Sequence, residues 1–349
     1  MKKATLVVSI SYQKNNIFDM NNPVNGRDNH MYIMKELKDL LFSNDINLCT
    51  QDINKIEESD YVFYNDIPAI FPVRRHGQKI FLIAMESIAV LSNNFNLNLY
   101  NYFDKIFTFN DDIIDEKKII KINYSFNLKA FDYINFKDKT GFICMVCGNK
   151  YSNYKYELYS ERLYLINYFE KKSKFQFSLY GTNWDQSYKL VFYKIIKSLH
   201  KYRFTFYFFK LIDLFINIFK LQKVFKIKYS NYKGMLSPKI PKLRYYKFNI
   251  CYENTSNING YITEKIFDCF LSGCVPVYLG APNITKYIPS NTFIDRRNFN
   301  SNDDLLNYLL SINSKDYDKF QENIKYFLES DNSLNFSTKF VANKIFNHI

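Results

Sequence analysis

The chain has 349 residues, more than one compact hydrophobic core usually serves, so we expect two domains or one large α/β unit. Hydrophobic residues make up 47% and charged residues 23%, a composition that excludes an intrinsically disordered chain. The net charge of +13 leaves nucleic acid, an anionic membrane and a phosphorylated substrate as candidate partners. Fifteen basic residues and a single acid lie between residues 186 and 247, so the excess charge belongs to one region.

The first part of the chain alternates strand-like and helix-like segments. In chain order we expect a strand at 4–10, a helix at 30–42, strands at 61–64 and 79–85, a helix at 97–103 and a strand at 105–109. Because this rhythm is typical of a parallel sheet with crossover helices, it predicts a Rossmann-like domain over residues 1–135. The basic start of the 4–10 segment resembles a signal peptide, but a first strand fits its short apolar run better.

A second α/β series follows a polar stretch at 123–140. We expect strands at 142–146, 175–180, 247–252 and 275–279, and helices at 157–171, 263–272, 303–312, 317–329 and 338–348. This series predicts a second domain over residues 136–335 and a C-terminal helix over residues 336–349. Two such halves leave a cleft between them, where ligands of these folds usually bind.

The segment 186–232 interrupts the second series and differs in kind. Its charged and polar residues recur every three or four positions, and apolar residues fill the rest, which predicts a basic amphipathic helix with a wide apolar face. Such a helix suits the plane of an anionic membrane. A buried helical hairpin or a dimer contact remains the alternative. Nucleic acid is disfavoured because no known nucleic-acid-binding module accompanies the charge.

Metal and redox chemistry find little support. Six cysteines are too few for a disulfide scaffold and fit a reducing compartment. Cys144 and Cys147 form a C-x-x-C, but they lie in a strand-like run without a second ligand pair. No stretch is long and apolar enough to predict a membrane-spanning helix, so we expect a cytoplasmic protein.

The most informative residues lie between 246 and 283. A strand ends at Tyr252, Gly260 turns the chain, and a helix begins near residue 262. The start of that helix presents unpaired N–H groups, to which Lys265 adds a full charge, so a phosphate would fit there. Glu264 could accept hydrogen bonds from sugar hydroxyls, and Tyr261 could stack on a base or a sugar. A surface helix start with an incidental Glu and Lys is the alternative.

This stretch resembles glycosyltransferase family 10, the α-1,3/4-fucosyltransferases. It carries Tyr-Lys-Phe at 246–248, Cys-Tyr-Glu-Asn at 251–254, Tyr-Ile-Thr-Glu-Lys at 261–265 and Val-Pro-Val-Tyr-Leu-Gly at 275–280, in the family's order. Glu-Ser at 86–87 is similar to the family's E-S-P or G-E-N stretch, with Ile88 in place of the usual Pro. Arg162 lies where the family has a helix with an arginine.

The resemblance implies an α/β chain of the GT-B fold, with two Rossmann-like domains facing a cleft and the basic amphipathic insertion in the second. It implies transfer of L-fucose from GDP-β-L-fucose, with inversion, to a hydroxyl of an N-acetylglucosamine or glucose unit. Glu86 is then the general base. Donor-binding residues implied by the resemblance are Arg162, Asn254, Tyr261, Glu264 and Lys265. Because protein cations would face the diphosphate, no metal and no resident cofactor are expected.

Two other functions stay open at this point. One is a GT-B transferase that uses a different nucleotide-sugar, and the other is an inactive relative that binds a glycan or a membrane. The expected acceptor is an oligosaccharide or a lipid-linked glycan in glycan biosynthesis or protein glycosylation. The expected location is the cytoplasm, peripherally at the inner membrane if the segment 186–232 binds anionic lipid, and no nucleic-acid partner is expected.

Overall fold

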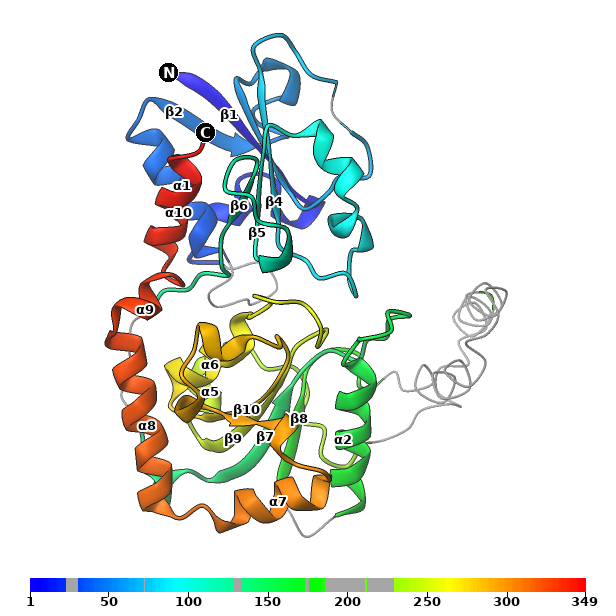
Figure 1. Ribbon diagram of the computed structural model, residues 1–349, viewed down its shortest axis with the longest axis vertical. Coiled ribbons are helices and arrows are strands. Elements are labelled where there is room, and N and C mark those ends of the chain that lie inside the picture. Colours follow the sequence, from blue (N-terminus) through cyan, green and yellow to red (C-terminus); the bar gives the residue numbers. More distant parts are fainter. Residues whose placement is uncertain (23–30, 72, 129–132, 173–175, 186–210, 212–228) are drawn as a thin grey trace.

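The computed structural model describes residues 1–22, 31–71, 73–128, 133–172, 176–185, 211 and 229–349. The chain forms two lobes, each built on a parallel β-sheet, and the C-terminal helices run along both lobes (Figure 1). The predicted insertion at 186–232 falls almost entirely outside the described residues. None of the helices in the described part of the chain is long and apolar enough to cross a membrane.

The first lobe contains a six-stranded sheet in the order β2-β1-β3-β4-β5-β6, with every pair parallel. Its strands are β1 (Lys2–Val7), β2 (Ile46–Thr50), β3 (Tyr61–Asn65), β4 (Lys79–Ala84), β5 (Lys105–Thr108) and β6 (Ile119–Lys121). The central strands are buried on both faces, as a parallel sheet requires. Helix α1 (Tyr32–Phe42) covers part of one face through Met34, Leu37 and Leu41.

Sequence patterns predicted this lobe in part. The strands expected at 61–64, 79–85 and 105–109 are confirmed, whereas the one expected at 4–10 ends at Val7. Strands β2 and β6 were not predicted, and β6 has only three residues. The helix expected at 97–103 is instead the 3-10 helix η6 (Leu97–Tyr102). Four of its six residues are asparagine or tyrosine, which are poor helix formers.

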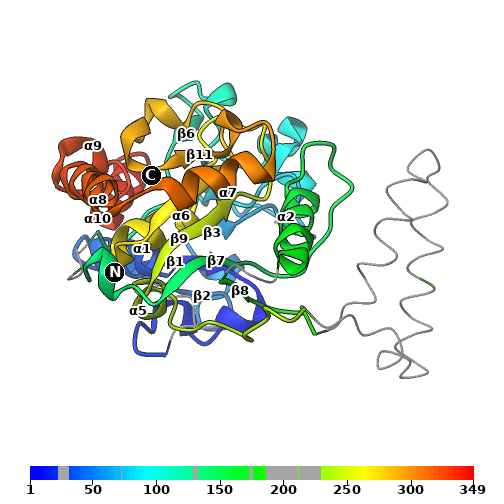
Figure 2. The same ribbon diagram turned by 90° about the horizontal axis from the view of Figure 1, so that it is seen from below.

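The second lobe contains a five-stranded parallel sheet in the order β11-β10-β9-β7-β8. Its strands are β7 (Gly141–Val146), β8 (Phe177–Tyr180), β9 (Tyr246–Tyr252), β10 (Val275–Leu279) and β11 (Ile294–Asp295). Its helices are α2 (Tyr159–Lys171), α5 (Ile240–Leu243), α6 (Glu264–Ser272), α7 (Asn302–Ser311), α8 (Ser314–Glu329) and α9 (Asp331–Leu334). Figure 2 shows α2 and α7 on the outside of this sheet.

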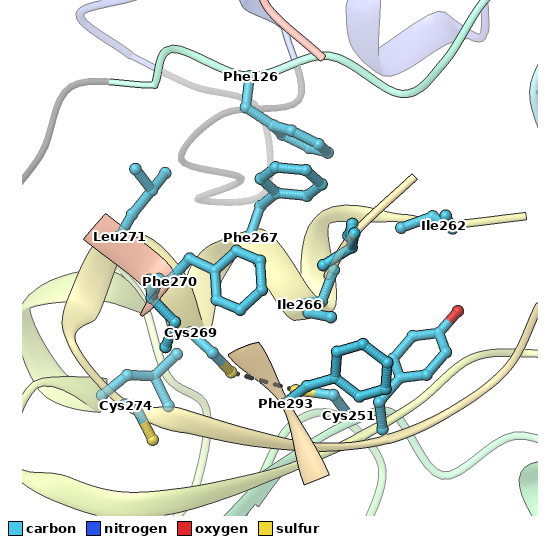
Figure 3. Close-up of a cluster of buried hydrophobic side chains, with 14 of the residues drawn as sticks. Phe126, Cys251, Ile262, Ile266, Phe267, Cys269, Phe270, Leu271, Cys274 and Phe293 are labelled. Carbon is cyan, nitrogen blue, oxygen red and sulfur yellow. Dashed lines mark hydrogen bonds between the residues drawn. The ribbon is translucent and has the colours of Figure 1, made fainter. Parts of the chain in front are cut away.

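Helix α6 is the buried helix of the second lobe. Phe267 stacks on Phe126 with 4.5 Å between ring centroids, and Cys251 of β9 lies 3.1 Å from Cys269 of α6, sulfur to sulfur (Figure 3). The helix ends at Gly273, whose φ of +67° makes it a left-handed cap. A Cβ at that position would also meet the ring of Tyr133 at 2.3 Å. This packing fixes the direction of α6, whose first residue is Glu264.

The chain returns to the first lobe at its end. The Phe126 N–H donates to the Phe336 carbonyl at 2.8 Å, and helix α10 (Thr338–Phe346) packs against α1 through Val341 and Ile345. The first sheet ends at Lys121 and the second begins at Gly141, so the predicted boundary at 135 lies between the two sheets. Both connections between the lobes therefore run past the same side of the molecule (Figure 1).

Candidate active site

Glu86 lies just beyond the carboxyl end of β4 and faces the second lobe. It interacts electrostatically with Lys150, which follows β7, and with Glu264 and Lys265 at the start of α6. The side chain is half-buried. The fold therefore brings the predicted general base to two of the predicted donor-binding residues, although they lie nearly half the chain apart.

The surroundings of Glu86 favour its protonated form. Burial is the largest cause that raises the pKa of the Glu86 carboxyl, and the nearby Asp66 raises it further. Lys150 and Lys265 act in the opposite direction without cancelling the rise. A carboxylate whose pKa is shifted upward is a stronger base once it is ionised, as a proton acceptor in catalysis requires.

Aromatic rings join the two lobes beside Glu86. The ring of Tyr261, which is 1% exposed, lies 4.9 Å from Phe109 and 6.1 Å from Tyr124, centroid to centroid. Tyr124 donates its hydroxyl hydrogen to the Met85 carbonyl. In this conformation the ring of Tyr261 has no face open to a base or a sugar. The structure thus corrects the stacking expected for Tyr261, because the ring gains more from burial between the lobes.

Arg162 is buried at the first turn of α2 and faces the end of β9. Its Nη2 donates to the Tyr252 carbonyl at 2.6 Å and to Asn254 Oδ1 at 3.0 Å, and its Nε donates to the same carbonyl at 3.1 Å. Asn254 in turn donates to the Tyr261 hydroxyl at 3.1 Å. Arg162, Asn254 and Tyr261 therefore form one chain of contacts. Through Nε and Nη2, Arg162 holds the loop that follows β9.

Lys265 lies in a compact ionic cluster at the start of α6. Its Nζ donates to Glu253 Oε2 at 2.9 Å and to Thr263 Oγ1 at 2.8 Å, and it lies 3.6 Å from Glu264 Oε1. Burial would lower the pKa of Lys265, but the charges of Glu253 and Glu264 outweigh that effect and raise it. Lys265 is therefore a permanently charged cation.

Glu253 is fully buried and holds this cluster together. It accepts hydrogen bonds from the Thr263 N–H at 2.8 Å and from the Thr263 hydroxyl at 2.7 Å, besides that from Lys265. Its role is therefore structural. Glu264 is more exposed than Lys265 and remains accessible to a sugar or a ribose.

The arrangement supplies the groups needed for displacement at a sugar phosphate. A carboxylate of one lobe interacts with a cation at a helix start of the other, so a group that can accept a proton lies near groups that can bind an anion. In the described part of the chain, no group of three or more histidine, cysteine or acidic side chains could hold a metal ion. Two cavities of about 640 and 610 Å³ lie elsewhere, one beside α7 and α8 and one beside Tyr180.

Sequence reasoning missed three residues of this site: Asp66, Asn94 and Lys150. Asp66 and Asn94 contact the backbone around Glu86, and Lys150 interacts with its charge. Asp66 directly follows β3, and side chains at the carboxyl ends of neighbouring parallel strands meet at one edge of the sheet. That rule could have found Asp66, whereas no sequence signal marks Asn94.

Comparison with known proteins finds a family match in the second lobe. Residues 210–345 match the model for the C-terminal part of glycosyltransferase family 10 (fucosyltransferase). An alpha-(1,3)-fucosyltransferase of Helicobacter pylori is 39% identical over 67 residues, which cover 19% of this chain and 14% of that relative. The matching stretch is thus a small part of that relative's length.

Solved structures resemble almost the whole chain. A crystal structure of an alpha1,3-fucosyltransferase with GDP-fucose has a TM-score of 0.51 and 15% sequence identity, over 99% of this chain and 90% of that one. The Anabaena protein HepE, in complex with UDP and glucose, has a TM-score of 0.57 and 9% identity, over 99% of both chains. At these identities the likeness shows the fold. Residues 210–345 are therefore similar to the C-terminal part of glycosyltransferase family 10, within a chain whose two parallel sheets have the GT-B fold.

Proposed function

We propose that the protein is an inverting fucosyltransferase that moves L-fucose from GDP-β-L-fucose to a hydroxyl of a glycan. The family match of residues 210–345 and the fold shared with an alpha1,3-fucosyltransferase solved with GDP-fucose support the donor. The observation that carries the proposal is the placement of Glu86, with its raised pKa, opposite Lys265 of the family motif.

The chemical step needs one base and one stabilised leaving group. Glu86 takes the proton of the acceptor hydroxyl while the hydroxyl oxygen attacks the anomeric carbon of fucose. The bond between that carbon and the phosphate oxygen breaks, and GDP leaves with the electron pair. Attack opposite the leaving group inverts the β-linked donor to an α-linked product. The proton ends on Glu86, which loses it to solvent before the next turnover.

The leaving diphosphate gains negative charge as this bond breaks. In this proposal Lys265 and the N–H groups at the start of α6 face the leaving diphosphate, and their positive charge lowers the barrier. Arg162 holds Asn254 and Tyr252, so its main contribution is to shape the loop that meets the donor.

The decisive experiment measures GDP release from GDP-fucose with N-acetyllactosamine, glucose-containing and chitobiose acceptors, in the presence of EDTA. We expect acceptor-dependent release that survives EDTA and falls in Lys265→Ala. Lys172→Ala is the matched control, because Lys172 forms a surface ion pair with Asp303 at 2.8 Å, on the far end of α2. Absence of release with every acceptor would contradict the proposal.

A transferase with another nucleotide-sugar is the second candidate. The fold shared with HepE, which was solved with UDP and glucose, favours testing this alternative. A donor panel of GDP-fucose, GDP-mannose and UDP-glucose separates the two, because only one donor should give acceptor-dependent release. An inactive binding protein would release nucleotide from none of them.

The acceptor and the location are further parts of the proposal. We propose an oligosaccharide or lipid-linked acceptor and a cytoplasmic protein that associates peripherally with the inner membrane through 186–232.

A deletion of the insertion tests the membrane role. The two ends of the insertion lie close together, because the Trp184 and Tyr229 rings are 5.5 Å apart, centroid to centroid. Ser230 and Asn231 bind Glu170 and should be kept. Replacing 186–228 by a short Gly-Ser linker should abolish co-sedimentation with anionic vesicles, and unchanged co-sedimentation would contradict the membrane role.

A further inference from the structure

The backbone that carries Glu86 is held by a side chain from the neighbouring strand. A single oxygen of Asp66, Oδ1, accepts hydrogen bonds from the Met85 N–H at 2.8 Å and the Glu86 N–H at 2.9 Å. Asp66 follows β3, and its own N–H donates to the Ile83 carbonyl at 2.9 Å. These bonds pin the chain at the point where it leaves β4.

Asn94 closes the same turn from its other side. It donates to Asp66 Oδ1 at 2.7 Å and to the Glu86 carbonyl at 3.1 Å, and it accepts from the Ile67 N–H at 2.9 Å. The Tyr100 hydroxyl, buried beneath, donates to the Asn94 carbonyl at 2.7 Å. Asn94 is 3% exposed, so its amide is committed to these contacts.

Asp66 adopts an unusual backbone conformation to make these bonds. Its φ is +67°, in the left-handed region that most residues avoid and that Asp and Asn tolerate best. Local strain of this kind persists only where the surrounding contacts enforce it, and it concentrates at functional sites. Here the enforcing contacts all lead to the Glu86 turn.

We propose that Asp66 and Asn94 are positioning residues for Glu86, and that they hold the turn which aims its carboxylate at the acceptor hydroxyl. This inference rests on the proposed function, in which Glu86 is the base. It adds that the position of the base is fixed by residues of its own lobe, outside the motif of the second lobe.

The charge of Asp66 has a second effect, on the proton affinity of Glu86. Several groups face Glu86 from the elements packed around it: Asp66, Lys150, Glu264 and Lys265, and the rings of Tyr124, Tyr159 and Tyr261. Among the charged groups, Asp66 alone belongs to the first lobe. Its charge raises the pKa of Glu86, and burial raises the pKa of Asp66 itself. Because the two carboxyls interact, the acid limb of the pH profile reports the titration of Asp66 and Glu86 together.

Two substitutions separate position from charge. Asp66→Gly removes the side chain and leaves φ unstrained, so the Glu86 turn loses its fixed geometry. We expect kcat to fall roughly tenfold to a hundredfold, with the KM for GDP-fucose unchanged. Asp66→Asn keeps an Oδ1 that can accept the same bonds, so it should restore most of kcat. A wild-type kcat in Asp66→Gly would overturn the positioning role.

The pH profile of kcat distinguishes this inference from a merely structural role of Asp66, which would leave the profile unchanged. Without the Asp66 charge, the pKa of Glu86 is lower, so the acid limb of kcat in Asp66→Asn should move to lower pH. Asp52→Asn is the matched control, because Asp52 follows β2 of the same sheet and accepts the Lys14 N–H at 2.9 Å. Its profile should equal that of the wild type, and an unmoved limb in Asp66→Asn would overturn the inference.

A measurement independent of turnover separates this inference from the proposed function. Carboxyl-labelled glutamate allows the Glu86 carbon to be titrated by NMR, with Glu86→Gln to assign the signal. If the wild type transfers no sugar but its Glu86 titrates above Glu86 of Asp66→Asn, the proposed function fails, whereas the part of the inference in which Asp66 controls Glu86 stands. Equal titration in both proteins overturns the inference whether or not the protein is active. This titration also decides the case if Asp66→Gly does not fold.

Discussion

The two facing edges of the molecule hold their glutamates in opposite ways. On the second lobe, Glu253 is fully buried and accepts hydrogen bonds from Lys265 and Thr263. On the first lobe, the hydrogen bonds recorded for Glu86 in the described residues are made by its backbone, and burial and Asp66 raise its pKa. The same residue type is a buried structural anchor at one edge and a half-buried carboxyl with a raised pKa at the other.

The difference follows from where each lobe places its fixed charge. In the second lobe the cation and its partners are within twelve residues of each other, so one loop and one helix start build the whole cluster. In the first lobe Asp66 and Asn94 hold the backbone that carries Glu86, and Lys150 and Lys265 act on its carboxyl from the second lobe. Different surroundings of this kind allow one fold to give separate roles to side chains of the same type.

Replacing Glu86 should test the catalytic half of this comparison. In Glu86→Gln the acceptor proton has no base, so kcat should fall about 10²- to 10⁴-fold while the affinity for GDP stays at its wild-type value. GDP release and calorimetric GDP binding measure the two quantities. Glu116→Gln is the control, since Glu116 lies at the surface 3.7 Å from Lys344. A kcat above a tenth of the wild-type value would remove Glu86 from the mechanism.

Replacing Glu253 should have the opposite signature. Glu253→Gln leaves Lys265 without its buried counter-charge and weakens the bonds from Thr263, so we expect the free energy of unfolding to fall by about 3–5 kcal/mol. Urea denaturation of the two Glu→Gln variants under the same conditions measures this loss. If Glu253→Gln unfolds within 1 kcal/mol of Glu86→Gln, the two glutamates are not held differently and the comparison fails.

The sequence was most informative where the contacts are local. The order of strands and helices predicted two α/β lobes, and the short motif at 261–265 predicted the helix start and its cation. The cap of α6 at Gly273 is local in the same sense, because a glycine directly after an apolar helix is a signal for a left-handed cap. Strand β6 was missed because two isoleucines between lysines carry no clear pattern.

Contacts between distant residues were not predictable in the same way. Asp66 and Glu86 are separated by a whole strand, and their meeting depends on the order of strands in the sheet. The burial of Tyr261 depends on Phe109 in the other lobe, so its sequence neighbours suggested an open ring where the structure has a packed one. The strand order of the first sheet determines the first contact, and the docking of the two lobes determines the second.

Gly260 tests how closely that docking is set. Its φ is +79°, and a Cβ there would lie 2.3 Å from the Phe109 carbonyl oxygen in the first lobe. Gly77 has a φ of +76° with nothing within 4 Å, so Gly77→Ala measures the backbone strain alone. We expect Gly260→Ala to lose about 1–3 kcal/mol more in urea denaturation than Gly77→Ala. Equal losses would mean that the lobes separate without cost.

Asp111 forms polar contacts between the same two lobes, and its replacement has the smallest expected effect. It follows β5 and accepts hydrogen bonds from Asn283 at 2.7 Å and from the Tyr287 hydroxyl at 2.6 Å, both in the second lobe. Burial would raise the pKa of Asp111, but the bonds from Lys121, Tyr287 and Asn283 outweigh it and hold the pKa below its usual value. The ionised carboxylate therefore stabilises the folded chain above the ordinary pKa of an aspartate, and this stabilisation is lost as pH falls through the lowered value.

Asp111→Asn should consequently flatten the acid side of the stability curve. Between pH 7 and pH 3 the wild type should lose about 1 kcal/mol more free energy of unfolding than Asp111→Asn, because only the wild type has this carboxylate to protonate. Asp39→Asn, which removes a surface ion pair with Lys35, should keep the wild-type pH dependence. If Asp111→Asn also keeps it, the aromatic contact of Tyr261 with Phe109 holds the lobes together and Asp111 only orients them.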